Sequence, residues 1–377
     1  MKKSFLVFSD LFFCILCFSS FAFGFNDPET LAIGSIAPDF NLPGIDGKNY
    51  TLNSFKDANV LVIAFICNHC PTSQAYEERL ITLTSDYARK GVKLVAINPN
   101  NPGSLRYDEL GWSDVGDSFE DMKVRAREKN FNFPYLYDGE TEIVSKQYGP
   151  VSTPHIFIFD KDRILRYNGR VDDMENPHKT PHSSDARNAI EALLNHKEVP
   201  VAVTKVFGCS IKWLEKNDWK NKAAIQWAKE AVTLDTISAS GLMGLVKNNS
   251  DKLRLINVWA TWCGPCVAEF SDFVTLSRIY KERDFEFISI SADDPEHKDR
   301  ALKFLKNKQS SGENYLFTED DKYKLIEAID PHWQGALPYT LLVEPGGKVV
   351  YSNQGAIDPE ELRKIIINDP FIGRLYK

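Results

Sequence analysis

Residues 257–266 read Asn257-Val258-Trp259-Ala260-Thr261-Trp262-Cys263-Gly264-Pro265-Cys266. This stretch ends an apolar run that begins at Leu253 and is typical of a buried β-strand. Apolar side chains then recur at the spacing of one helix face, at Phe270, Phe273, Leu276 and Tyr280. The two cysteines are therefore predicted to lie where a strand turns into the N-terminus of a helix. The free N–H groups and the dipole of a helix lower the pKa of a thiol placed there.

The same pattern occurs earlier in the chain. An apolar run from Val60 to Phe65 precedes the motif Cys67-Asn68-His69-Cys70-Pro71, and a segment of helical spacing follows and ends at Gly91. The two C-x-x-C motifs lie roughly 200 residues apart, and a repeat of that length indicates two copies of a domain. A chain of 377 residues is long enough for two domains with separate cores.

Each copy also contains a proline that enters an apolar strand. These prolines are Pro154, which follows Thr153, and Pro338, which follows Leu337. Proline is tolerated at the first residue of a strand, but its recurrence after both motifs indicates a further role. We predict two α/β domains in tandem, each with a central mixed β-sheet flanked by helices.

Composition and charge exclude several classes of protein. Hydrophobic residues make up 43% and charged residues 26%, as in ordinary globular proteins, which argues against a disordered chain or a multi-span membrane protein. The 45 Lys and Arg residues are outnumbered by 52 Asp and Glu residues, giving a net charge of -7. Without a basic field, nucleic acid is not expected as a partner.

The N-terminus predicts export. Lys2 and Lys3 precede the apolar run 11–18, which is too short to span a bilayer but is typical of a secretory signal peptide. Cleavage after Gly24 is expected, with cleavage after Ala22 or an uncleaved anchor as alternatives. We predict a signal peptide at 1–24, a periplasmic or otherwise extracytoplasmic location, and no lasting membrane span after cleavage.

The cysteine pattern indicates redox chemistry. With Cys14 and Cys17 lying in the signal peptide, the mature chain keeps Cys67, Cys70, Cys209, Cys263 and Cys266. Thiols in an oxidising compartment are either paired or reactive, and a bridge between residues so close in sequence stabilises little. Zinc knuckles are normally separated by about 15 to 20 residues, which these pairs do not match. Neither a metal nor an organic cofactor is predicted.

These motifs resemble known families. Trp262 to Cys266 with Leu337-Pro338 resembles the thioredoxin superfamily, and Asn257 to Trp262 with Glu269-Phe270 resembles its TlpA/ResA branch of exported thiol-disulfide oxidoreductases. The first copy is similar to AhpC/TSA-type redoxin domains with a C-N-H-C-P motif, which also end in a segment like 208–213. The resemblance implies a redoxin-like domain at 25–213 and a TlpA/ResA-like domain at 236–377. A helical composition predicts a linker helix over 214–235.

Position and resemblance together predict the reacting groups. Cys263 is expected to be the nucleophile and Cys266 the resolving thiol, with Cys67 and Cys70 in matching roles. The residues expected to support them are His69, Trp262, Gly264 and Pro265. His69 is expected to stabilise the Cys67 thiolate and make the first site the more oxidising.

The resemblance also gives the two prolines a role. In the thioredoxin fold the corresponding X-Pro bond is cis and lies against the C-x-x-C motif. There the backbone of the preceding residue, here Thr153 or Leu337, pairs with the substrate chain. We therefore expect cis bonds before Pro154 and Pro338.

Several residues leave alternatives open. Cys209 is either a buried free thiol or a third redox cysteine that forms a disulfide with Cys67 or Cys70. Thioredoxin has a buried acid where this chain has Asn257, so that proton transfer to the resolving thiol would need water or Glu269.

Three further predictions concern His155, the polar stretch 99–117 and the tryptophans around the predicted linker. His155 is either near Cys67 or an ordinary strand histidine, and the polar stretch 99–117 is expected to form a loop beside the first site. The tryptophans Trp213, Trp219 and Trp227 are expected to mark docking of the linker helix.

The predicted function is thiol-disulfide exchange with protein thiols and disulfides as partners, with a membrane electron donor left open. One alternative is a thiol peroxidase in the first domain that the second domain reduces. Peroxiredoxins carry a Thr three residues before the attacking cysteine, where this chain has Ala64 or Cys67, which argues against it. The other alternative is a copper-binding assembly factor that uses Cys67, His69 and Cys70.

Overall fold

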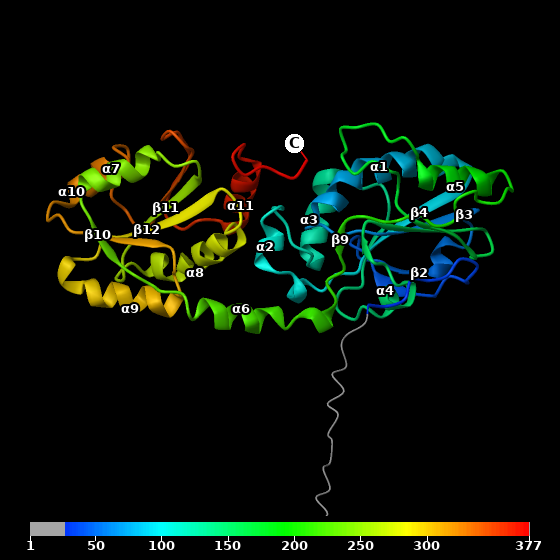
Figure 1. The fold of residues 1–377 in the computed structure, drawn as a ribbon, viewed down its shortest axis with the longest axis horizontal. Helices are drawn as coiled ribbons and strands as arrows, with labels where there is room; N and C mark the ends of the chain where they lie inside the picture. Colours follow the sequence, from blue (N-terminus) through cyan, green and yellow to red (C-terminus); the bar gives the residue numbers. More distant parts are fainter. Residues whose placement is uncertain (1–26, 377) are drawn as a thin grey trace, which may run out of the picture.

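The structure is a computed structural model that describes residues 27–376. The predicted signal peptide lies outside these residues. Two α/β domains stand side by side, and helix α6 (Trp219–Trp227) links them along the lower edge of the view (Figure 1). Each domain is built on one mixed β-sheet, which confirms the predicted fold class.

The first domain contains a five-stranded sheet in the order β5-β4-β3-β7-β8. Its central strand β3 is parallel to β4 and antiparallel to β7. The strands of this sheet are β3 Val60–Phe65, β4 Val92–Asn98, β5 Tyr135–Tyr137, β7 His155–Phe159 and β8 Leu165–Gly169. Two short pairs lie outside it, formed by β1 Asn41–Pro43 with β2 Asn49–Thr51 and by β6 Ser152–Thr153 with β9 Cys209–Ser210.

Helices cover both faces of the first sheet. They are α1 Pro71–Tyr87, α3 Phe119–Lys129, α4 Ile143–Tyr148 and α5 Asp185–Leu194, with 3-10 turns at Leu52–Phe55, Ala88–Lys90 and Pro102–Ser104. The short helix α2 Tyr107–Leu110 instead packs against the core of the second domain. Successive side chains of a strand point to opposite faces. Val62 of β3 therefore packs in one core with Tyr76 of α1, and Ile63 packs in the other core with Tyr148 of α4.

The second domain repeats this plan with a six-stranded sheet in the order β10-β13-β12-β11-β14-β15. Leu255 of its central strand packs with Phe270 of α8, and Ile256 packs on the other face with Leu242 of α7. The strands are β10 Asp235–Ile237, β11 Leu253–Trp259, β12 Phe285–Ser291, β13 Glu313–Phe317, β14 Tyr339–Val343 and β15 Val349–Gln354. The helices are α7 Ala239–Lys247, α8 Gly264–Ile279, α9 Lys298–Lys308, α10 Lys322–Ile329 and α11 Pro359–Asn368, with a 3-10 turn at Pro295–His297.

The linker is helical over a shorter range than 214–235. A 3-10 turn at Leu214–Lys216 precedes α6, and the second sheet already begins at Asp235. Trp219 and Trp227 pack on Tyr107, with ring centroids 5.5 and 5.4 Å apart, and the Arg278 guanidinium lies 3.9 Å from the Trp227 ring centroid. The linker helix is thus docked against both domains by two of the three tryptophans expected to do so.

The domains also contact each other directly. The Arg283 guanidinium lies 3.7 Å from the ring centroid of Trp112, and Arg363 donates to the Ser113 carbonyl oxygen at 3.0 Å. These contacts join the loop of the first domain to α11 and to the turn that follows α8 in the second domain. The polar stretch 99–117 therefore contributes residues to the interface between the domains and also contains a short helix.

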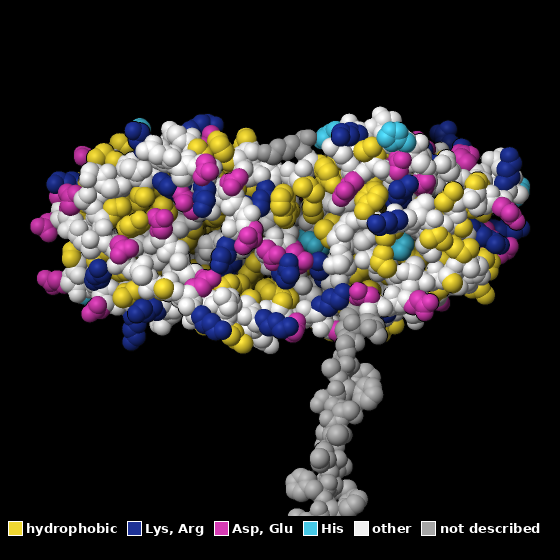
Figure 2. Space-filling model, viewed as in Figure 1, with side chains coloured by type: hydrophobic (Ala, Val, Ile, Leu, Met, Phe, Trp, Pro, Cys, Tyr) yellow, Lys and Arg dark blue, Asp and Glu magenta, His cyan; other side chains and the backbone are white. Residues whose placement is uncertain are grey.

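The surface carries both signs of charge in close alternation on the face shown in Figure 2. This distribution agrees with the absence of a basic field in the composition. Over residues 27–376, no helix combines the length and the apolar character that crossing a bilayer requires.

Candidate active sites

The second C-x-x-C motif caps a helix, as its position predicts. Cys263 is the N-cap of α8, and its Sγ accepts a hydrogen bond from the Cys266 N–H at 3.3 Å. The two cysteines form a disulfide, with Cα atoms 5.3 Å apart. The side chain of Trp262 is 65% exposed, and Gly264 and Pro265 are exposed too. Cys263 and Cys266 are only 6% and 1% exposed, so the disulfide lies just beneath a surface formed by these flanking residues.

The Leu337–Pro338 bond is cis, as predicted. Gly335 and Ala336 before it are exposed, and Leu337 is half-buried. The chain that leads into β14 is thus accessible in the second domain.

The side chain with an unusual pKa beside this site is Glu269, which follows Cys266 by one helical turn. Burial raises the pKa of Glu269 to about 7, although its Oε2 accepts a hydrogen bond from the Ile357 N–H at 2.8 Å. Asn257 instead donates to the Thr340 hydroxyl oxygen at 3.1 Å. The titratable group on this face of the helix is therefore the carboxyl of Glu269.

The first motif is arranged differently from the second. Helix α1 begins at Pro71, so that Cys70 is its N-cap and Cys67 lies upstream of the helix. The prediction that Cys67 occupies the helix N-terminus is wrong. Proline is favoured at the first helical position because it lacks the N–H that would stay unbonded there. The direct succession Cys70-Pro71 was the sequence signal that could have identified the cap.

The surroundings of Cys70 stabilise a thiolate. Its Sγ accepts hydrogen bonds from the N–H groups of Ser73 and Cys209, both at 3.4 Å. Burial alone would raise the pKa of Cys70, but the Cys209 and Cys67 thiols, the His69 charge and the Ser73 N–H hold this pKa well below its usual value. Cys70 is thus the better nucleophile of the first motif.

Cys67 and Cys209 are the protonated thiols around it. Burial, followed by the hydrogen bond to Cys70, raises the pKa of Cys67 well above its usual value. The hydrogen bond to Cys70, followed by burial, raises the pKa of Cys209. The protonated form of both thiols is therefore favoured.

A buried ion pair lies beside the first motif. His69 Nδ1 is 2.6 Å from Asp117 Oδ2, and both side chains are almost inaccessible. Burial favours the neutral form of each group, yet the attraction between them raises the pKa of His69 and lowers the pKa of Asp117. Asp117 also accepts hydrogen bonds from the Asn68 N–H at 2.7 Å and the Asn100 amide at 2.7 Å. Sequence reasoning missed Asp117, which closes the loop expected beside the site.

Within the described part of the chain, Cys67, His69 and Asp117 form a group whose ligand atoms lie within 4.8 Å of one another. This set differs from the copper ligands expected from sequence, because Asp117 takes the place of Cys70. Asp117 Oδ2 is already bonded to His69 Nδ1, and Cys67 is a protonated thiol. A metal ion would have to displace both, so the hydrogen bonds fit a thiol site better than a metal centre.

The Thr153–Pro154 bond is also cis, as predicted, but its surroundings differ from those in the second domain. Strand β6 pairs antiparallel with β9, so that Thr153 faces Cys209. The Thr153 hydroxyl lies 3.0 Å from Cys67 Sγ. The backbone expected to receive a substrate chain is thus paired with the protein's own chain.

Gly208 makes this pairing possible. Its φ is +137°, and a Cβ there would lie 2.1 Å from the Thr153 carbonyl oxygen. Only glycine fits so close to another backbone.

The first site is closed to solvent. Cys67 is 2% exposed and Cys70 is fully buried. Part of the cover comes from the C-terminal segment of the second domain. Arg374 forms an ion pair with Asp114 at 2.9 Å and donates to Gln74 Oε1 at 3.2 Å. The cysteines of the second site are also buried, at 6% and 1% exposed, but the residues between and before them are exposed, whereas Asn68 and His69 of the first motif are buried.

His155 is an ordinary strand histidine. Burial lowers the pKa of His155 to about 3, and its Nδ1 accepts a hydrogen bond from the Val151 N–H at 3.3 Å. Its ring packs on Phe157, with centroids 4.5 Å apart. The neutral imidazole is thus engaged away from the thiols.

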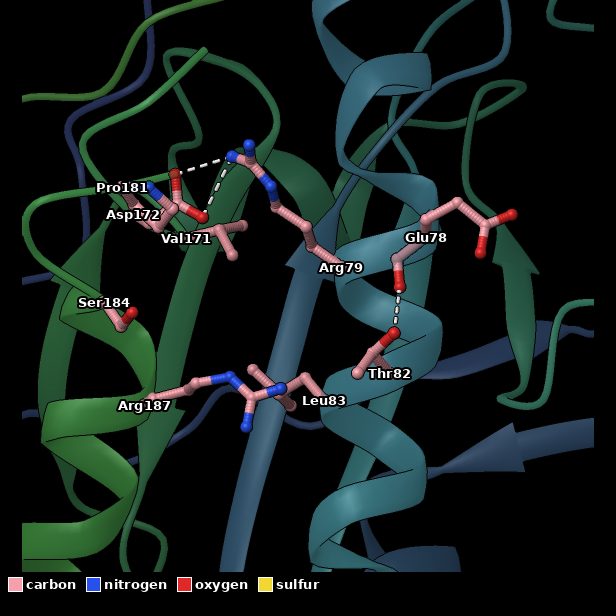
Figure 3. A pocket seen from close by; sticks show the side chains of 9 residues that line it. All are labelled: Glu78, Arg79, Thr82, Leu83, Val171, Asp172, Pro181, Ser184 and Arg187. Atoms are coloured by element: carbon pink, nitrogen blue, oxygen red, sulfur yellow. Dashed lines mark hydrogen bonds and ion pairs between the residues drawn. The ribbon is translucent and has the colours of Figure 1, made fainter. Parts of the chain in front are cut away.

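A surface pocket between α1 and α5 is separate from both sites (Figure 3). Arg79 reaches from α1 to Asp172 at 2.7 Å. Cysteine does not occur among the lining residues, which are Glu78, Arg79, Thr82, Leu83, Val171, Asp172, Pro181, Ser184 and Arg187. The pocket is therefore not part of the thiol chemistry.

Comparisons with known proteins match both halves of the chain. Residues 33–168 match the AhpC/TSA family and residues 239–366 match the Redoxin family. Thiol-disulfide oxidoreductase ResA from Bacillus thuringiensis (strain Al Hakam) is 30% identical over 142 residues, which cover 38% of this chain and 78% of the relative. ResA from Bacillus thuringiensis subsp. konkukian (strain 97-27) is 27% identical over 168 residues, which cover 43% of this chain and 86% of the relative.

Solved structures also resemble parts of the chain. An uncharacterized conserved protein from Geobacillus kaustophilus is 39% identical, with a TM-score of 0.44, and the match covers 49% of this chain and 94% of that protein. A hypothetical protein from Sinorhizobium meliloti 1021 is 34% identical, with a TM-score of 0.44, and the match covers 49% of this chain and 97% of that protein.

Proposed function

Since this chain belongs to the ResA-like thiol-disulfide oxidoreductases of the thioredoxin superfamily, we propose that it is an exported enzyme that exchanges disulfides with protein partners through Cys263 and Cys266. The observation that carries the proposal is the disulfide at the N-cap of α8, whose cysteines are 6% and 1% exposed but are flanked by the exposed residues Trp262, Gly264 and Pro265. A protein disulfide that contacts these exposed flanking residues is brought close to the Cys263 sulfur.

The chemistry follows from the geometry. In the reduced enzyme, the Cys263 thiolate attacks a substrate disulfide, one substrate sulfur leaves as a thiolate, and a mixed disulfide forms. Cys266 then loses its proton and attacks Cys263, which releases the second substrate thiolate and restores the Cys263–Cys266 disulfide. Two electrons pass to the substrate. Glu269 lies one helical turn after Cys266 in α8 and has a pKa of about 7, and it is therefore the proposed acceptor of the Cys266 proton, directly or through water.

The test is reduction of insulin disulfides by the full chain with dithiothreitol as electron donor. Wild-type protein is expected to accelerate the reaction, and Cys263→Ser is expected to remove the acceleration. Ser271→Ala, which changes an exposed hydroxyl on the same helix, is the matched control. Full activity in Cys263→Ser would refute the proposal.

The first domain is proposed as a second thiol site centred on Cys67 and Cys70, in a chain organised as 25–213, 214–235 and 236–377. The proposal is supported by the N-cap position of Cys70 and by the matches to two redoxin families. Trp262, Gly264 and Pro265 shape the open site, and His69 and Thr153 shape the closed one.

Export is proposed from the apolar N-terminal segment and from the disulfide chemistry. An oxidising compartment keeps a disulfide of this kind oxidised between turnovers. Fractionation of cells that express the full chain should place the protein outside the cytoplasm. Recovery in the cytoplasm with an intact N-terminus would contradict this.

A thiol peroxidase is the second candidate for the first domain, because Cys70 is a buried N-cap thiolate followed by proline. Peroxide consumption with dithiothreitol in the Cys263→Ser/Cys266→Ser protein would support it. Tight stoichiometric Cu(I) uptake without insulin reduction would instead support the copper-binding alternative.

A further inference from the structure

We propose that Cys209 is a third reacting thiol of the first domain and that it forms a disulfide with Cys70 across the β6–β9 strand pair. The chemistry rests on the proposed function, because it is the same thiol–disulfide exchange. The inference adds to the proposed function the thiol that pairs with Cys70 and the kind of oxidant that the closed site admits.

The strand pairing fixes the position of Cys209. Thr153 and Cys209 are opposite each other in the β6–β9 ladder, and Cys70 Sγ lies 3.4 Å from the Thr153 carbonyl oxygen. The Cys209 N–H donates to the same sulfur at 3.4 Å, which brings Cys209 against Cys70. A disulfide needs Cβ atoms about 3.5 to 4.5 Å apart, and Cys209 is a direct neighbour of Cys70 because its backbone nitrogen contacts Cys70 Sγ.

The two thiols beside Cys70, those of Cys67 and Cys209, differ in solvent exposure. Cys67 is 2% exposed, and its sulfur contacts the Thr153 hydroxyl at 3.0 Å, deep in the site. Cys209 is half-buried and is the most accessible of the three thiols. An incoming reagent that reaches Cys70 past β9 therefore meets Cys209 on its way, and Cys209 is the thiol placed to resolve the product.

The same strand excludes a protein substrate from the usual place. The backbone of Thr153 is paired with Cys209, and Gly208 lies too close to the Thr153 carbonyl for any other chain to pass between them. The oxidant inferred for this closed site is a low-molecular-weight disulfide, because a protein chain cannot pair with the Thr153 backbone there. The open second site and the closed first site would thus serve reactants of different size.

The exchange between the small disulfide, Cys70 and Cys209 takes place in two steps. The Cys70 thiolate attacks one sulfur of a small disulfide, the S–S bond breaks, and one thiolate leaves while a mixed disulfide forms on Cys70. The Cys209 sulfur then attacks Cys70 Sγ as its proton passes to the second departing thiolate. The small disulfide gains two electrons, and the two protein thiols become the Cys70–Cys209 disulfide.

The experiment is a disulfide map of the full chain that carries Cys263→Ser and Cys266→Ser. The protein is equilibrated with graded ratios of reduced and oxidised glutathione, quenched in acid, alkylated and analysed by peptide mass spectrometry. We expect a peptide that joins Cys70 to Cys209, and we expect the same cross-link when Cys67→Ser is added.

The matched variant is Cys209→Ser, in which glutathione should remain attached to Cys70 or be displaced by Cys67. Near-UV circular dichroism of each variant checks that β9 is still packed, and the fraction of cross-linked peptide is read only for folded protein. The proposal is overturned if Cys209 stays fully alkylated while Cys70 is bonded to Cys67 or to glutathione.

This outcome is independent of the proposed function. Insulin reduction reports on Cys263 and Cys266, which are absent from the mapped protein. Loss of the Cys70–Cys209 cross-link with intact insulin reduction would refute only the inference about Cys209.

Discussion

The carboxylate of Asp117 lies 2.6 Å from the imidazole of His69, and both side chains are buried beside the first pair of cysteines. The pair joins the loop before α3 to the turn before α1. It places a positive charge near Cys70, since the charge on His69 is among the groups that lower the pKa of that thiol. Removing the carboxylate should therefore change both stability and reactivity.

Asp117→Asn is expected to lower the free energy of unfolding by about 3 kcal/mol, because it leaves one partner of a buried ion pair. The raised pKa of His69 contributes stability that is full below about pH 6.5, the usual histidine value, and is lost as the pH rises through the folded pKa. Urea unfolding between pH 6 and pH 9 should show this loss in wild type and not in Asp117→Asn. Equal pH dependence in both proteins would contradict the ion pair.

Cys70 is expected to be the reactive thiol of the first motif. At pH 6, iodoacetamide should modify Cys70 in the reduced protein, because its pKa is held well below the usual value while that of Cys67 is raised. The fast phase should persist in Cys67→Ser and disappear in Cys70→Ser. Peptide mapping that finds Cys67 modified first would reverse the assignment.

The first site is expected to be more oxidising than the second. The His69 charge stabilises the reduced, thiolate form of Cys70, and Gly264 and Pro265 offer no such group. A difference of about 30 mV corresponds to roughly 1.4 kcal/mol, so one charge-assisted contact should be measurable against glutathione. Proteins with Cys263→Ser/Cys266→Ser or Cys67→Ser/Cys70→Ser give the two potentials separately. His69→Ala should lower the first potential, and a first site more reducing than the second would contradict the assignment.

Glu269 should set the pH dependence of the second site. Its pKa of about 7 means that the carboxylate, which accepts the Cys266 proton, forms as the pH rises through neutrality. The rate of insulin reduction should therefore rise with an inflection near pH 7 that Glu269→Gln removes. A carboxyl whose pKa is raised on folding also makes the folded state less stable above that pH. Glu269→Gln should accordingly unfold at higher urea than wild type at pH 8.

Gly208→Ala should loosen strand β9. The added Cβ would lie 2.1 Å from the Thr153 carbonyl oxygen at a φ of +137°, which costs about 1 to 3 kcal/mol. Faster hydrogen exchange at Cys209 and faster alkylation of Cys70 would report the displacement. Gly244→Ala in α7 is the matched control, since a Cβ there meets no atom within 4 Å and alanine favours the helix. Unchanged protection at Cys209 would show that β9 tolerates the side chain.

Much of the architecture could be read from local patterns. The strand–motif–helix order at Cys263 was predicted correctly because it depends on residues adjacent in sequence. The cis bonds before Pro154 and Pro338 were predicted correctly from the resemblance to the thioredoxin fold. The choice between Cys67 and Cys70 as the cap also had a local signal in Pro71, which the analogy with the second motif obscured.

The sequence by itself determined that the chain has two α/β domains and that each presents a pair of cysteines at the start of a helix. Only the tertiary structure decided which thiol is stabilised as the thiolate in the first domain and which site is open. Those features depend on Asp117, which is 48 residues from His69, and on Cys209, which is 139 residues from Cys70. Periodicity and motif spacing describe neighbours along the chain, whereas burial, charge and strand pairing between distant segments arise only when the chain has folded.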